Sequence, residues 1–395
     1  MPEVTSMLTT YQKSERLKRL PPYLFVEIDK AKRKLQQEGK DLIDMGVGDP
    51  DLPTPAHIIA RLKAAVDDPA NHRYSFTEGI AELRQAIARW YKRRFEVVLD
   101  PNTEILPLLG SKEGIAHLPL ALANPGDAVL VPDPCYPPYR SGTLFAGAEV
   151  ISMPLLEENT FFPDLGAINQ KAVRRAKLMF LNYPNNPTAA VASAEQFQEA
   201  IAMAKEYGVA IAHDNAYSEI AFDGYRPISF LQISGAKEVG IEFHSLSKTY
   251  NMTGWRVGWA CGNATLITAL NQLKTNLDSG IFQPVQWAGI EALEGDQAPL
   301  QQAIATYQER RDLLIDGLGR AGWKIPKPVA SFYIWARLPT QEPSMAFAAR
   351  VLEHAHVVLT PGVGFGPSGE GFVRFSLTLP TERIQEVVDR LSKIL

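Results

Sequence analysis

Short apolar runs alternate with longer segments of helical periodicity over most of the chain. Runs of about five residues rich in Val, Ile, Leu and Ala predict buried strands. Between them, apolar residues recur at three- and four-residue spacing, which predicts amphipathic helices. The predicted strands are 105–109, 128–131, 177–181, 209–212, 239–243 and 257–261, and the main helices between them are 80–95, 110–123, 193–207 and 284–293. This alternation favours an α/β domain with a mostly parallel sheet.

The pattern changes near residue 296, where a long helix over 299–320 is predicted to bridge two domains. Beyond it, strands and helices group in a way that predicts a smaller α+β domain. The expected elements there are strands at 331–338 and 372–377 and helices at 345–354 and 381–395, and near the N-terminus a helix at 23–38 and a strand at 42–45. We therefore expect an N-terminal segment (1–55) that packs with the small domain (296–395), and a large domain (56–295).

Composition narrows the class of protein. The chain has 395 residues, 46% of them hydrophobic, and a formal net charge of −4 with no block of basic residues, so a nucleic-acid surface is not expected. Two cysteines, Cys135 and Cys261, cannot form a disulfide framework and fit a reducing compartment. No apolar run reaches the length of about 20 residues that a membrane span needs. We expect a cytoplasmic enzyme without a metal site.

One lysine stands out from its surroundings. Lys248 follows the apolar run 239–243 and lies among Ser, Thr and Tyr residues. Burial lowers the pKa of an amine, which makes it nucleophilic near neutral pH and suited to a Schiff base with an aldehyde such as pyridoxal phosphate. Arg256 and Ser245 could then hold the phosphate. On these residues alone, an exposed lysine at the end of a strand is an equally good interpretation.

Two other predicted strands also end in polar side chains. Asn182 follows the strand 177–181, and Asp214 follows the strand 209–212, with Tyr217 three residues later. The carboxyl ends of parallel strands form the edge at which α/β sheets bind ligands. A solvated aspartate in a turn is the alternative for Asp214, but the same placement recurs at Asn182 and Lys248.

Further candidates are each weak alone. Residues 110–114 (Gly-Ser-Lys-Glu-Gly) form a strand–glycine–helix start of the kind that cradles phosphate, although ordinary helix caps look similar. Tyr136, in a proline-rich loop over 132–139, could stack on an aromatic cofactor or simply pack. Gly48 would let a ligand approach the backbone, and Arg374, inside an apolar strand, is either paired in the fold or available to an anion.

Together, in this order and spacing, these motifs resemble the class I/II aminotransferases of the aspartate aminotransferase superfamily. The resemblance runs from about Tyr23 to the C-terminus. It implies pyridoxal phosphate as cofactor and fold type I, with a mostly parallel seven-stranded sheet flanked by helices and a smaller α+β domain. The motifs are Gly48-Asp49-Pro50, Gly110-Ser111-Lys112, Asn182-Tyr183-Pro184-Asn185-Asn186-Pro187, Asp214-x-x-Tyr217, Ser245-x-Ser247-Lys248, Arg256-x-Gly258 and Arg374.

The resemblance assigns catalytic roles at the cofactor ring. Lys248 would be the Schiff-base lysine and carry the proton between the substrate Cα and the cofactor. Asp214 would pair with the pyridine nitrogen and keep it protonated. Tyr217 and Asn182 would hydrogen-bond the phenolic oxygen of the ring, and Tyr136 would stack on its face.

It also assigns the two anionic groups. The cofactor phosphate would be held by Ser111, Lys112, Ser245, Ser247 and Arg256, and by Tyr74 of the neighbouring subunit, which implies a homodimer with shared active sites. Arg374 would bind the substrate α-carboxylate, helped by Asn182 and the backbone of Gly48. Tyr23 and Lys112 would be further contacts on the substrate side.

Within the superfamily, the resemblance is nearest to the LL-diaminopimelate aminotransferases. It rests on residues 22–25 (Pro-Tyr-Leu-Phe), 110–114 and 242–249. The expected reaction is transfer of the amino group of LL-diaminopimelate to 2-oxoglutarate. An aspartate or broad-specificity aminotransferase, a cysteine–sulfur β-lyase on the same fold, and a non-catalytic aminotransferase-like module of a regulator are the alternatives. The last is disfavoured because only about 20 residues precede Tyr23, too few for a DNA-binding domain.

Overall fold

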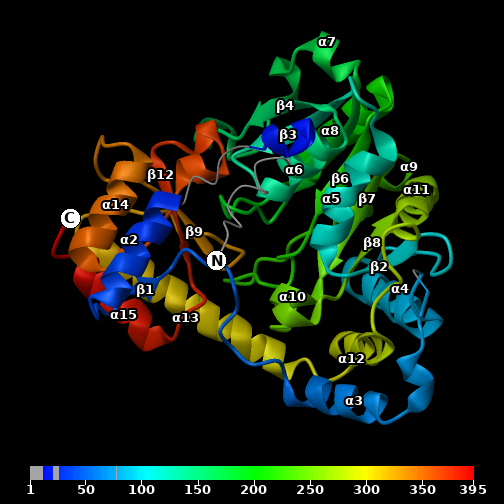
Figure 1. The fold of residues 1–395 in the computed structure, drawn as a ribbon, viewed down its shortest axis with the longest axis horizontal. Helices are drawn as coiled ribbons and strands as arrows, with labels where there is room; N and C mark the ends of the chain where they lie inside the picture. Colours follow the sequence, from blue (N-terminus) through cyan, green and yellow to red (C-terminus); the bar gives the residue numbers. More distant parts are fainter. Residues whose placement is uncertain (1–11, 21–25, 77) are drawn as a thin grey trace, which may run out of the picture.

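A seven-stranded sheet forms the centre of the computed structural model, which describes residues 12–20, 26–76 and 78–395 (Figure 1). Five adjacent strands of this sheet run parallel to one another, whereas β8 runs antiparallel to both of its neighbours, β2 and β7. In sheet order the strands are β2 (Ile105–Leu108), β8 (Gly258–Gly262), β7 (Gly240–Ser245), β6 (Ala210–Asp214), β5 (Ala176–Asn182), β3 (Ala128–Asp133) and β4 (Glu149–Pro154). The mostly parallel sheet that the sequence predicts is confirmed.

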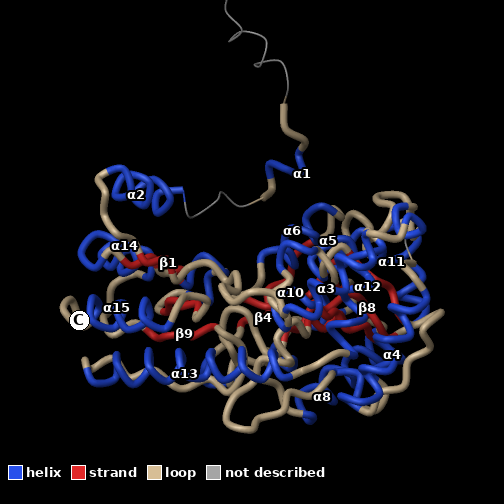
Figure 2. The backbone as a smooth tube through the Cα atoms, turned by 90° about the horizontal axis from the view of Figure 1, so that it is seen from below, coloured by secondary structure: helices blue, strands red, loops and turns tan. Residues whose placement is uncertain are grey.

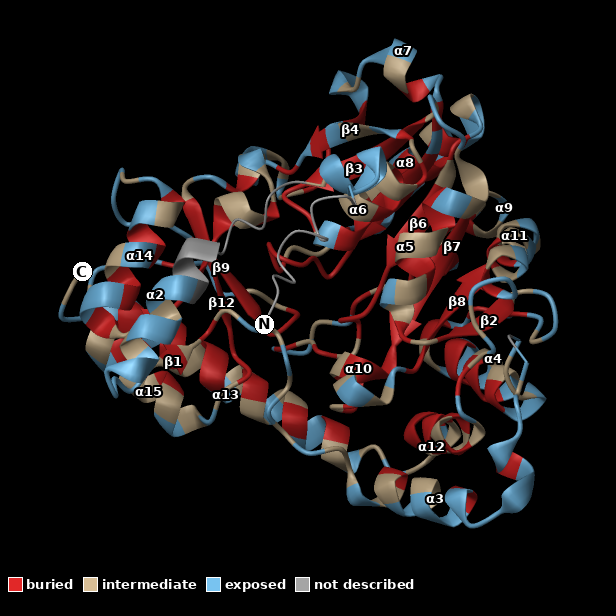
Figure 3. Ribbon diagram, viewed as in Figure 1, coloured by how far each residue is buried: buried red, intermediate tan, exposed pale blue. Residues whose placement is uncertain are grey.

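Both faces of this sheet are buried, because successive side chains of a strand point to opposite faces. Leu178 and Phe180 of β5 belong to one hydrophobic cluster, and Met179 and Leu181 belong to another. Figure 3 shows the buried strands between helices whose outer surfaces are exposed. The helices of this part of the chain are α3 (Ala56–Val66), α4 (Ala81–Phe95), α5 (Ser111–Leu122), α6 (Pro137–Phe145), α7 (Gln170–Val173), α8 (Ala194–Tyr207), α9 (Ala236–Val239), α10 (Leu246–Thr249), α11 (Ala264–Lys274) and α12 (Gln283–Glu294).

A second group of elements packs beside the sheet around its own hydrophobic cluster. It contains a three-stranded antiparallel sheet in the order β11-β12-β9 and a parallel pair, β1 with β10. The elements are β1 (Ile43–Asp44), β9 (Tyr333–Arg337), β10 (Val357–Val358), β11 (Thr360–Pro361), β12 (Phe372–Ser376), α2 (Val26–Gln37), α13 (Ala298–Arg320), α14 (Ser344–Ala355) and α15 (Thr381–Leu391), and the short α1 (Glu15–Lys18) precedes them. Because β1 pairs with β10, the N-terminal part of the chain returns to this group.

The long helix α13 connects the two groups, as Figures 1 and 2 show from two directions. Its first turn contributes Leu300 to the cluster under the large sheet, and from Ala303 onward it packs in the second cluster. The division at residues 55 and 295 stays a prediction. The segment from Ala216 to Phe222, which lies within the predicted large domain, packs in the second cluster.

The local differences from the sequence prediction have simple causes. Residues 132–139 were expected to be a loop, but α6 begins at Pro137. Two prolines fit there because the first turn of a helix needs no backbone donors from them. Strand β4 and helix α3 were not predicted, and β4 has a mixed burial pattern that gives no clear apolar run. Within the described ranges, no helix has the length and hydropathy needed to cross a bilayer.

The strand ends place polar residues along one edge of the sheet. Asn182 and Asp214 are paired across β5 and β6, and Asp214 pairs in turn with Phe243 of β7. Lys248 lies three residues beyond the end of β7, in α10. The three positions therefore lie at neighbouring carboxyl ends, as the sequence predicts.

A glycine at the start of β8 permits the close packing of this edge. A Cβ atom at Gly258 would lie 2.6 Å from the carbonyl oxygen of His244 and 2.8 Å from the amide nitrogen of Ser111. Both neighbours are backbone atoms of packed elements and cannot rotate away. We predict that Gly258→Ala lowers the free energy of unfolding by about 1–3 kcal/mol, the usual cost of overpacking. Chemical denaturation followed by fluorescence measures this.

Gly319→Ala is the matched control. Gly319 lies in α13 with open space around its hypothetical Cβ, and alanine favours helix more than glycine does. Its stability should be unchanged or slightly raised. Equal stability of the two variants would contradict the packing argument.

Candidate active site

A cavity of about 710 Å³ opens at this edge of the large sheet. Its walls come from segments that are far apart in the sequence. The lining residues are Gly48, Ser111, Lys112, Tyr136, Pro137, Asn186, Asp214, Ala216, Tyr217, Ser245, Ser247, Lys248, Thr253, Arg256, Tyr333, Phe365 and Arg374. Both groups of elements described above contribute, since Tyr333 lies on β9 and Arg374 on β12.

Lys248 projects into the cavity from the short helix α10. Its Nζ donates a hydrogen bond to the carbonyl oxygen of Gly48 at 2.7 Å and lies 5.8 Å from the ring centre of Phe332. Burial lowers the pKa of the Lys248 amine from its ordinary value. A partly buried amine whose neutral form is favoured is suited to attack a carbonyl carbon.

Asp214 ends β6 and is buried. Its Oδ2 accepts a hydrogen bond from the hydroxyl of Tyr139 at 2.8 Å, while its Oδ1 has no partner among the described residues. Burial raises the pKa of this carboxyl to about 6, against the hydrogen bond from Tyr139 that acts to lower it. A buried acceptor without a partner, on the wall of a cavity, suits a ligand that brings a donor or a positive charge.

An anion cradle lies at the start of α5. Gly110 precedes this helix with φ of 79° and provides no side-chain cap, so the N-terminal end of the helix dipole faces an anion site. A side chain at Gly110 would collide with the guanidinium of Arg256, so the glycine allows Arg256 to lie against the turn. Arg256 donates to the carbonyl oxygens of Thr253 at 2.8 Å and Leu109 at 3.3 Å. The hydroxyls of Ser111, Ser245 and Ser247 line the same cavity.

A second cation faces the cavity from the other group of elements. The guanidinium of Arg374 lies 4.1 Å from the ring centre of Tyr333 and 4.7 Å from that of Phe365. It donates to the side-chain oxygen of Asn186 at 2.8 Å and to the carbonyl oxygen of Gly46 at 2.7 Å. Its buried Nε has no partner among the described residues. A fixed, stacked guanidinium with an open donor is suited to a carboxylate.

Comparison with known proteins assigns the family. The family model for aminotransferase class I and II matches residues 40–391. The chain belongs to the class I and II aminotransferases. It is 55% identical over 384 residues to the LL-diaminopimelate aminotransferase of Syntrophobacter fumaroxidans, covering 97% of this chain and 99% of that protein. The LL-diaminopimelate aminotransferase of Moorella thermoacetica is 54% identical over 97% of this chain and 98% of its own length.

Solved structures give the same result. The chain is similar to the substrate-bound structure of BacF from Bacillus subtilis, with a TM-score of 0.92, 41% identity and coverage of 97% of this chain and 98% of that one. It is also similar to a mutant of the aspartate aminotransferase of Thermus thermophilus, with a TM-score of 0.91, 29% identity and coverage of 98% and 100%. This aminotransferase is therefore a PLP-dependent transaminase of fold type I, as the sequence predicts.

The cavity fits pyridoxal phosphate on observations of its own. The unpartnered Oδ1 of Asp214 is an acceptor for a protonated pyridine nitrogen. The glycine turn before α5, with Arg256 against it, forms a cradle for a phosphate. The amine of Lys248 lines the same cavity as both and can reach an aldehyde held there. An acceptor, an anion site and an amine are the three complementary groups that this cofactor needs.

Most of the residues predicted from the sequence are brought together in this aminotransferase. Those that line the cavity are Gly48, Ser111, Lys112, Tyr136, Asp214, Tyr217, Ser245, Ser247, Lys248, Arg256 and Arg374. Tyr74 lies elsewhere on the chain and is 76% exposed. Tyr23 lies outside the described residues, so its predicted role as a substrate contact stays a prediction.

Asn182 is placed differently from its predicted role. It is buried and does not line the cavity, because its amide group is used by the backbone. Its Nδ2 donates to the carbonyl oxygens of Asp214 at 2.7 Å and Pro184 at 3.3 Å, and its Oδ1 accepts from the amide of Asn186 at 2.7 Å. Asn182 thus ties the ends of β5 and β6 together. Asn186, four residues later in the same motif, is the asparagine on the cavity wall.

Several residues of the site were not predicted from the sequence, and three of them show why. Asn186 belongs to a motif with three asparagines, and nothing in the sequence distinguishes them. Tyr333 lies on a predicted strand, but the alternation of side chains does not reveal which face meets the cavity; its hydroxyl lies 3.4 Å from that of Tyr217. Tyr139 lies in the proline-rich segment 132–139, and the sequence assigns it no role. It lies against Asp214 because α6 begins at Pro137.

The raised pKa of Asp214 makes the apoprotein sensitive to pH. Between about pH 4 and 6 the folded apoprotein keeps a proton on this carboxyl that the unfolded chain has released, so stability falls as the pH rises through that window. At pH 8 the ionised Asp214 should cost the apoprotein about 2–3 kcal/mol. We predict that Asp214→Asn stabilises the apoprotein by up to this amount at pH 8 but not at pH 4. Thermal unfolding across this pH range measures it.

Addition of pyridoxal phosphate provides the control. A cationic pyridine nitrogen would pair with the carboxylate and offset its cost, so the wild-type holoenzyme should be more stable than the Asp214→Asn protein with cofactor. An apoprotein whose stability at pH 8 does not respond to the substitution would contradict this account.

Proposed function

We propose that this aminotransferase transfers the amino group of LL-diaminopimelate to 2-oxoglutarate. The support is the identity of 52–55% over 96–97% of the chain with proteins that carry the name LL-diaminopimelate aminotransferase. The family match over residues 40–391 spans every residue that lines the cavity. The single structural observation that supports transamination is the placement of Lys248, Asp214 and Arg374 around one cavity.

Lys248 holds the central role. When bound, pyridoxal phosphate supplies an electron sink for the negative charge that develops at the substrate Cα. Lys248 would hold the aldehyde end of the cofactor, and its amine would move the proton at the substrate Cα. The lowered pKa of Lys248 suits this task, because a general base works best when its pKa lies near the working pH.

Asp214, Tyr217 and Tyr136 position the ring. The open oxygen of Asp214 accepts the N–H of the pyridine and holds that proton in place. Tyr217 presents its hydroxyl, 3.4 Å from that of Tyr333, to the phenolic oxygen of the ring. Tyr136, in an edge contact with Tyr139 at 5.8 Å between ring centres, offers its face for stacking.

The phosphate is bound by residues of two chains. The N-terminus of α5 and the side chains of Ser111, Lys112, Ser245, Ser247 and Arg256 form the part of the site that one chain supplies. Tyr74 supplies the remaining part from the partner subunit of a homodimer. In support, Tyr74 and Phe76 are 76% and 79% exposed in the single chain, and Leu277 and Phe282 are also exposed apolar residues. Exposed apolar residues in one region are typical of a subunit contact.

Arg374 binds the α-carboxylate of the amino donor. Asn186 takes the place that the sequence suggested for Asn182, because it lines the cavity and already accepts a hydrogen bond from Arg374. The carbonyl oxygens of Gly46 and Gly48 fix Arg374 and Lys248 in position. Lys112 and Tyr23 are proposed to contact the far end of the donor. We also propose a role in lysine biosynthesis and a cytoplasmic location for this enzyme.

A second candidate is an aspartate or broad-specificity aminotransferase. The similarity to the Thermus thermophilus aspartate aminotransferase favours it, with a TM-score of 0.91. We rank it lower because the identity to that protein is 29%, against 55% to the LL-diaminopimelate aminotransferase of Syntrophobacter fumaroxidans.

A donor panel tests the proposal. Each amino acid is supplied with 2-oxoglutarate, and glutamate, the new keto acid and ammonia are measured. We expect LL-diaminopimelate to give the highest kcat/KM, by about 100-fold over aspartate, since a site built for a polar group rejects donors that lack it. Lys248→Ala is the control, and it should lose turnover and the cofactor absorbance while remaining folded.

The outcomes separate the alternatives. Equal kcat/KM for aspartate would replace the proposal with the second candidate. Release of ammonia without a newly aminated acceptor would indicate a lyase. An active, coloured Lys248→Ala protein would refute the role of this lysine.

Removal of the carboxylate contact should affect donor binding. Arg374→Ala loses two charge-assisted hydrogen bonds, and we predict that kcat/KM falls about 100-fold for every donor, mostly through KM. Steady-state kinetics with two donors measures this. Arg337→Ala, on the neighbouring strand β9 but outside the cavity lining, is the control and should leave KM unchanged. An unchanged KM in Arg374→Ala would remove the residue from the site.

A further inference from the structure

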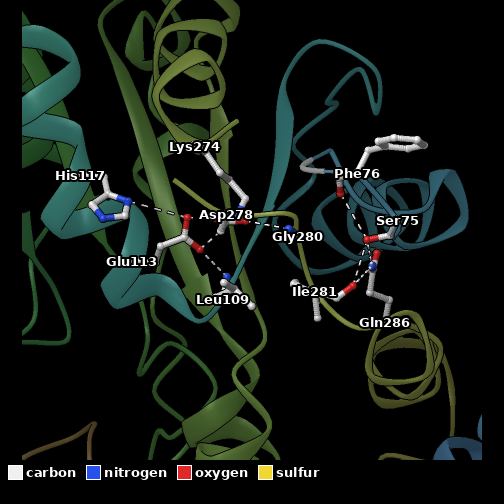
Figure 4. A network of polar contacts seen from close by, with 10 residues as sticks. All are labelled: Ser75, Phe76, Leu109, Glu113, His117, Lys274, Asp278, Gly280, Ile281 and Gln286. Atoms are coloured by element: carbon white, nitrogen blue, oxygen red, sulfur yellow. Dashed lines mark hydrogen bonds and ion pairs between the residues drawn. The ribbon is translucent and has the colours of Figure 1, made fainter. Parts of the chain in front are cut away.

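An ionic network with a buried lysine at its centre lies next to the anion cradle, and its lysine is outside the cavity lining (Figure 4). Lys274, at the end of α11, is 0% exposed. Its Nζ lies 3.0 and 3.1 Å from the two carboxylate oxygens of Glu113 and 2.7 and 2.8 Å from those of Asp278. One ammonium thus joins two carboxylates that come from different segments. We call Glu113, Lys274 and Asp278 the ionic network.

One arm of the ionic network holds the turn at 109–111, between β2 and α5, which we call the phosphate turn. Glu113 lies in the first turn of α5, and its Oε2 accepts a hydrogen bond from the amide of Leu109 at 2.6 Å. Leu109 also receives a hydrogen bond from Arg256 on its carbonyl oxygen. The carboxylate of Glu113 therefore fixes the turn between β2 and α5, from which Ser111 and Lys112 line the cavity.

The other arm reaches the segment that carries Tyr74. Asp278 accepts a hydrogen bond from the amide of Gly280 at 2.7 Å, and Gly280 packs so closely on the carbonyl of Phe76 that a side chain there would collide with it. Ser75 Oγ donates to the carbonyl oxygen of Ile281 at 2.9 Å.

Gln286 closes this arm. Its Nε2 donates both to Ser75 Oγ at 2.9 Å and to the carbonyl oxygen of Ile281 at 2.7 Å. The loop 278–281 is thereby held against Ser75 and Phe76, and Figure 4 shows these contacts beside Lys274. The position of Asp278 is thus linked to the backbone that directly follows Tyr74, at Ser75 and Phe76.

We propose that the ionic network is a positioning element for two cofactor phosphates: the phosphate of its own chain, through the turn at 109–111, and that of the partner, through Tyr74. The proposal rests on the shared active site of the proposed function. Lys274 does not line the cavity, so it acts through the two segments that it joins.

The charges explain why the arms are coupled. The buried ammonium of Lys274 needs compensating charge, and the partly buried carboxylates of Glu113 and Asp278 both provide it. Loss of the ammonium leaves two carboxylates facing each other, which repel and draw in water. Both segments then shift. Binding at a preorganised phosphate site is sensitive to displacements of about 1 Å.

The first experiment compares two forms of the cofactor. Lys274→Met keeps most of the side-chain volume and removes the charge. The Kd of the apoenzyme, prepared from the holoenzyme, for pyridoxal phosphate and for pyridoxal, which lacks the phosphate, is measured by equilibrium dialysis and absorbance. We expect the Kd for pyridoxal phosphate to rise about 10- to 100-fold and that for pyridoxal by about twofold at most.

A matched variant separates positioning from stability. Arg311 is a buried cation in α13 that pairs with Asp223 and is remote from the phosphate turn. Arg311→Met should lower the thermal midpoint without changing the ratio of the two Kd values. An equal rise in both Kd values for Lys274→Met would overturn the proposal, because a merely structural role weakens both ligands alike. If Lys274→Met does not fold, Glu113→Gln gives the same readout with a smaller change.

Mixed dimers test the two arms separately. In the first, one chain carries Lys274→Met and the other Lys248→Ala, so the single complete site has a weakened turn and an intact partner segment. In the second, one chain is wild type and the other carries both substitutions, so the complete site has an intact turn and a weakened partner segment. We expect weaker binding of pyridoxal phosphate at the complete site of both dimers, relative to a dimer of wild type with Lys248→Ala.

The results distinguish this proposal from the proposed function. Unchanged binding in the second dimer would overturn the arm that reaches the partner. Tyr74→Phe placed on the partner chain tests the shared site itself, and no effect there would mean that the proposed site sharing fails. The difference between the Kd values for pyridoxal phosphate and pyridoxal tests the turn at 109–111. It does not depend on which amino donor the enzyme uses.

Discussion

A buried carboxylate that is kept without a full set of partners is the constraint around which the site is built. Asp214 receives one side-chain hydrogen bond, from Tyr139, and its second oxygen has no partner among the described residues. Lys248 lines the same cavity but donates to the carbonyl oxygen of Gly48. If the amine and the carboxylate paired with each other, neither would be available to a ligand. The fold holds them apart. This preorganisation lowers the free energy of unfolding of the apoprotein, and a bound cofactor offsets that loss.

The sheet makes this separation possible. Strands β5, β6 and β7 are parallel neighbours, so the segments that follow them leave the sheet at one edge. Each segment delivers one kind of group: the asparagine motif after β5, the carboxylate at the end of β6, and the amine after β7. The antiparallel strand β8 then returns beside β7 and brings Arg256 to the start of α5, where Gly110 leaves room for it. The charges of the site therefore follow from strand order and direction.

Sequence analysis predicted the parts of this arrangement that depend on burial and on strand ends. Apart from β4, the strands of the large sheet appear as mostly apolar runs, and Asp214 and Lys248 were found because they follow such runs. The direction in which each side chain points could not be predicted from the sequence. Asn182 and Asn186 are four residues apart in one motif, and only the turn after β5 decides that the first binds backbone while the second lines the cavity. Tyr333 is brought to the cavity by packing between distant segments, which no local pattern encodes.

Glu242 shows why burial and charge alone do not identify a functional carboxylate. It lies on β7, next to the strand that carries Asp214, and is completely buried. Burial would raise its pKa, but hydrogen bonds from His213, Ser229 and Tyr91 keep the pKa below its ordinary value. Asp214, with a single side-chain donor, has a raised pKa of about 6. Two buried acids on adjacent strands thus differ in the number of donors that the fold supplies. Glu242 is fully satisfied and fixes the strands, whereas Asp214 retains an open acceptor on the cavity wall, and that open acceptor is what makes it available to a cofactor.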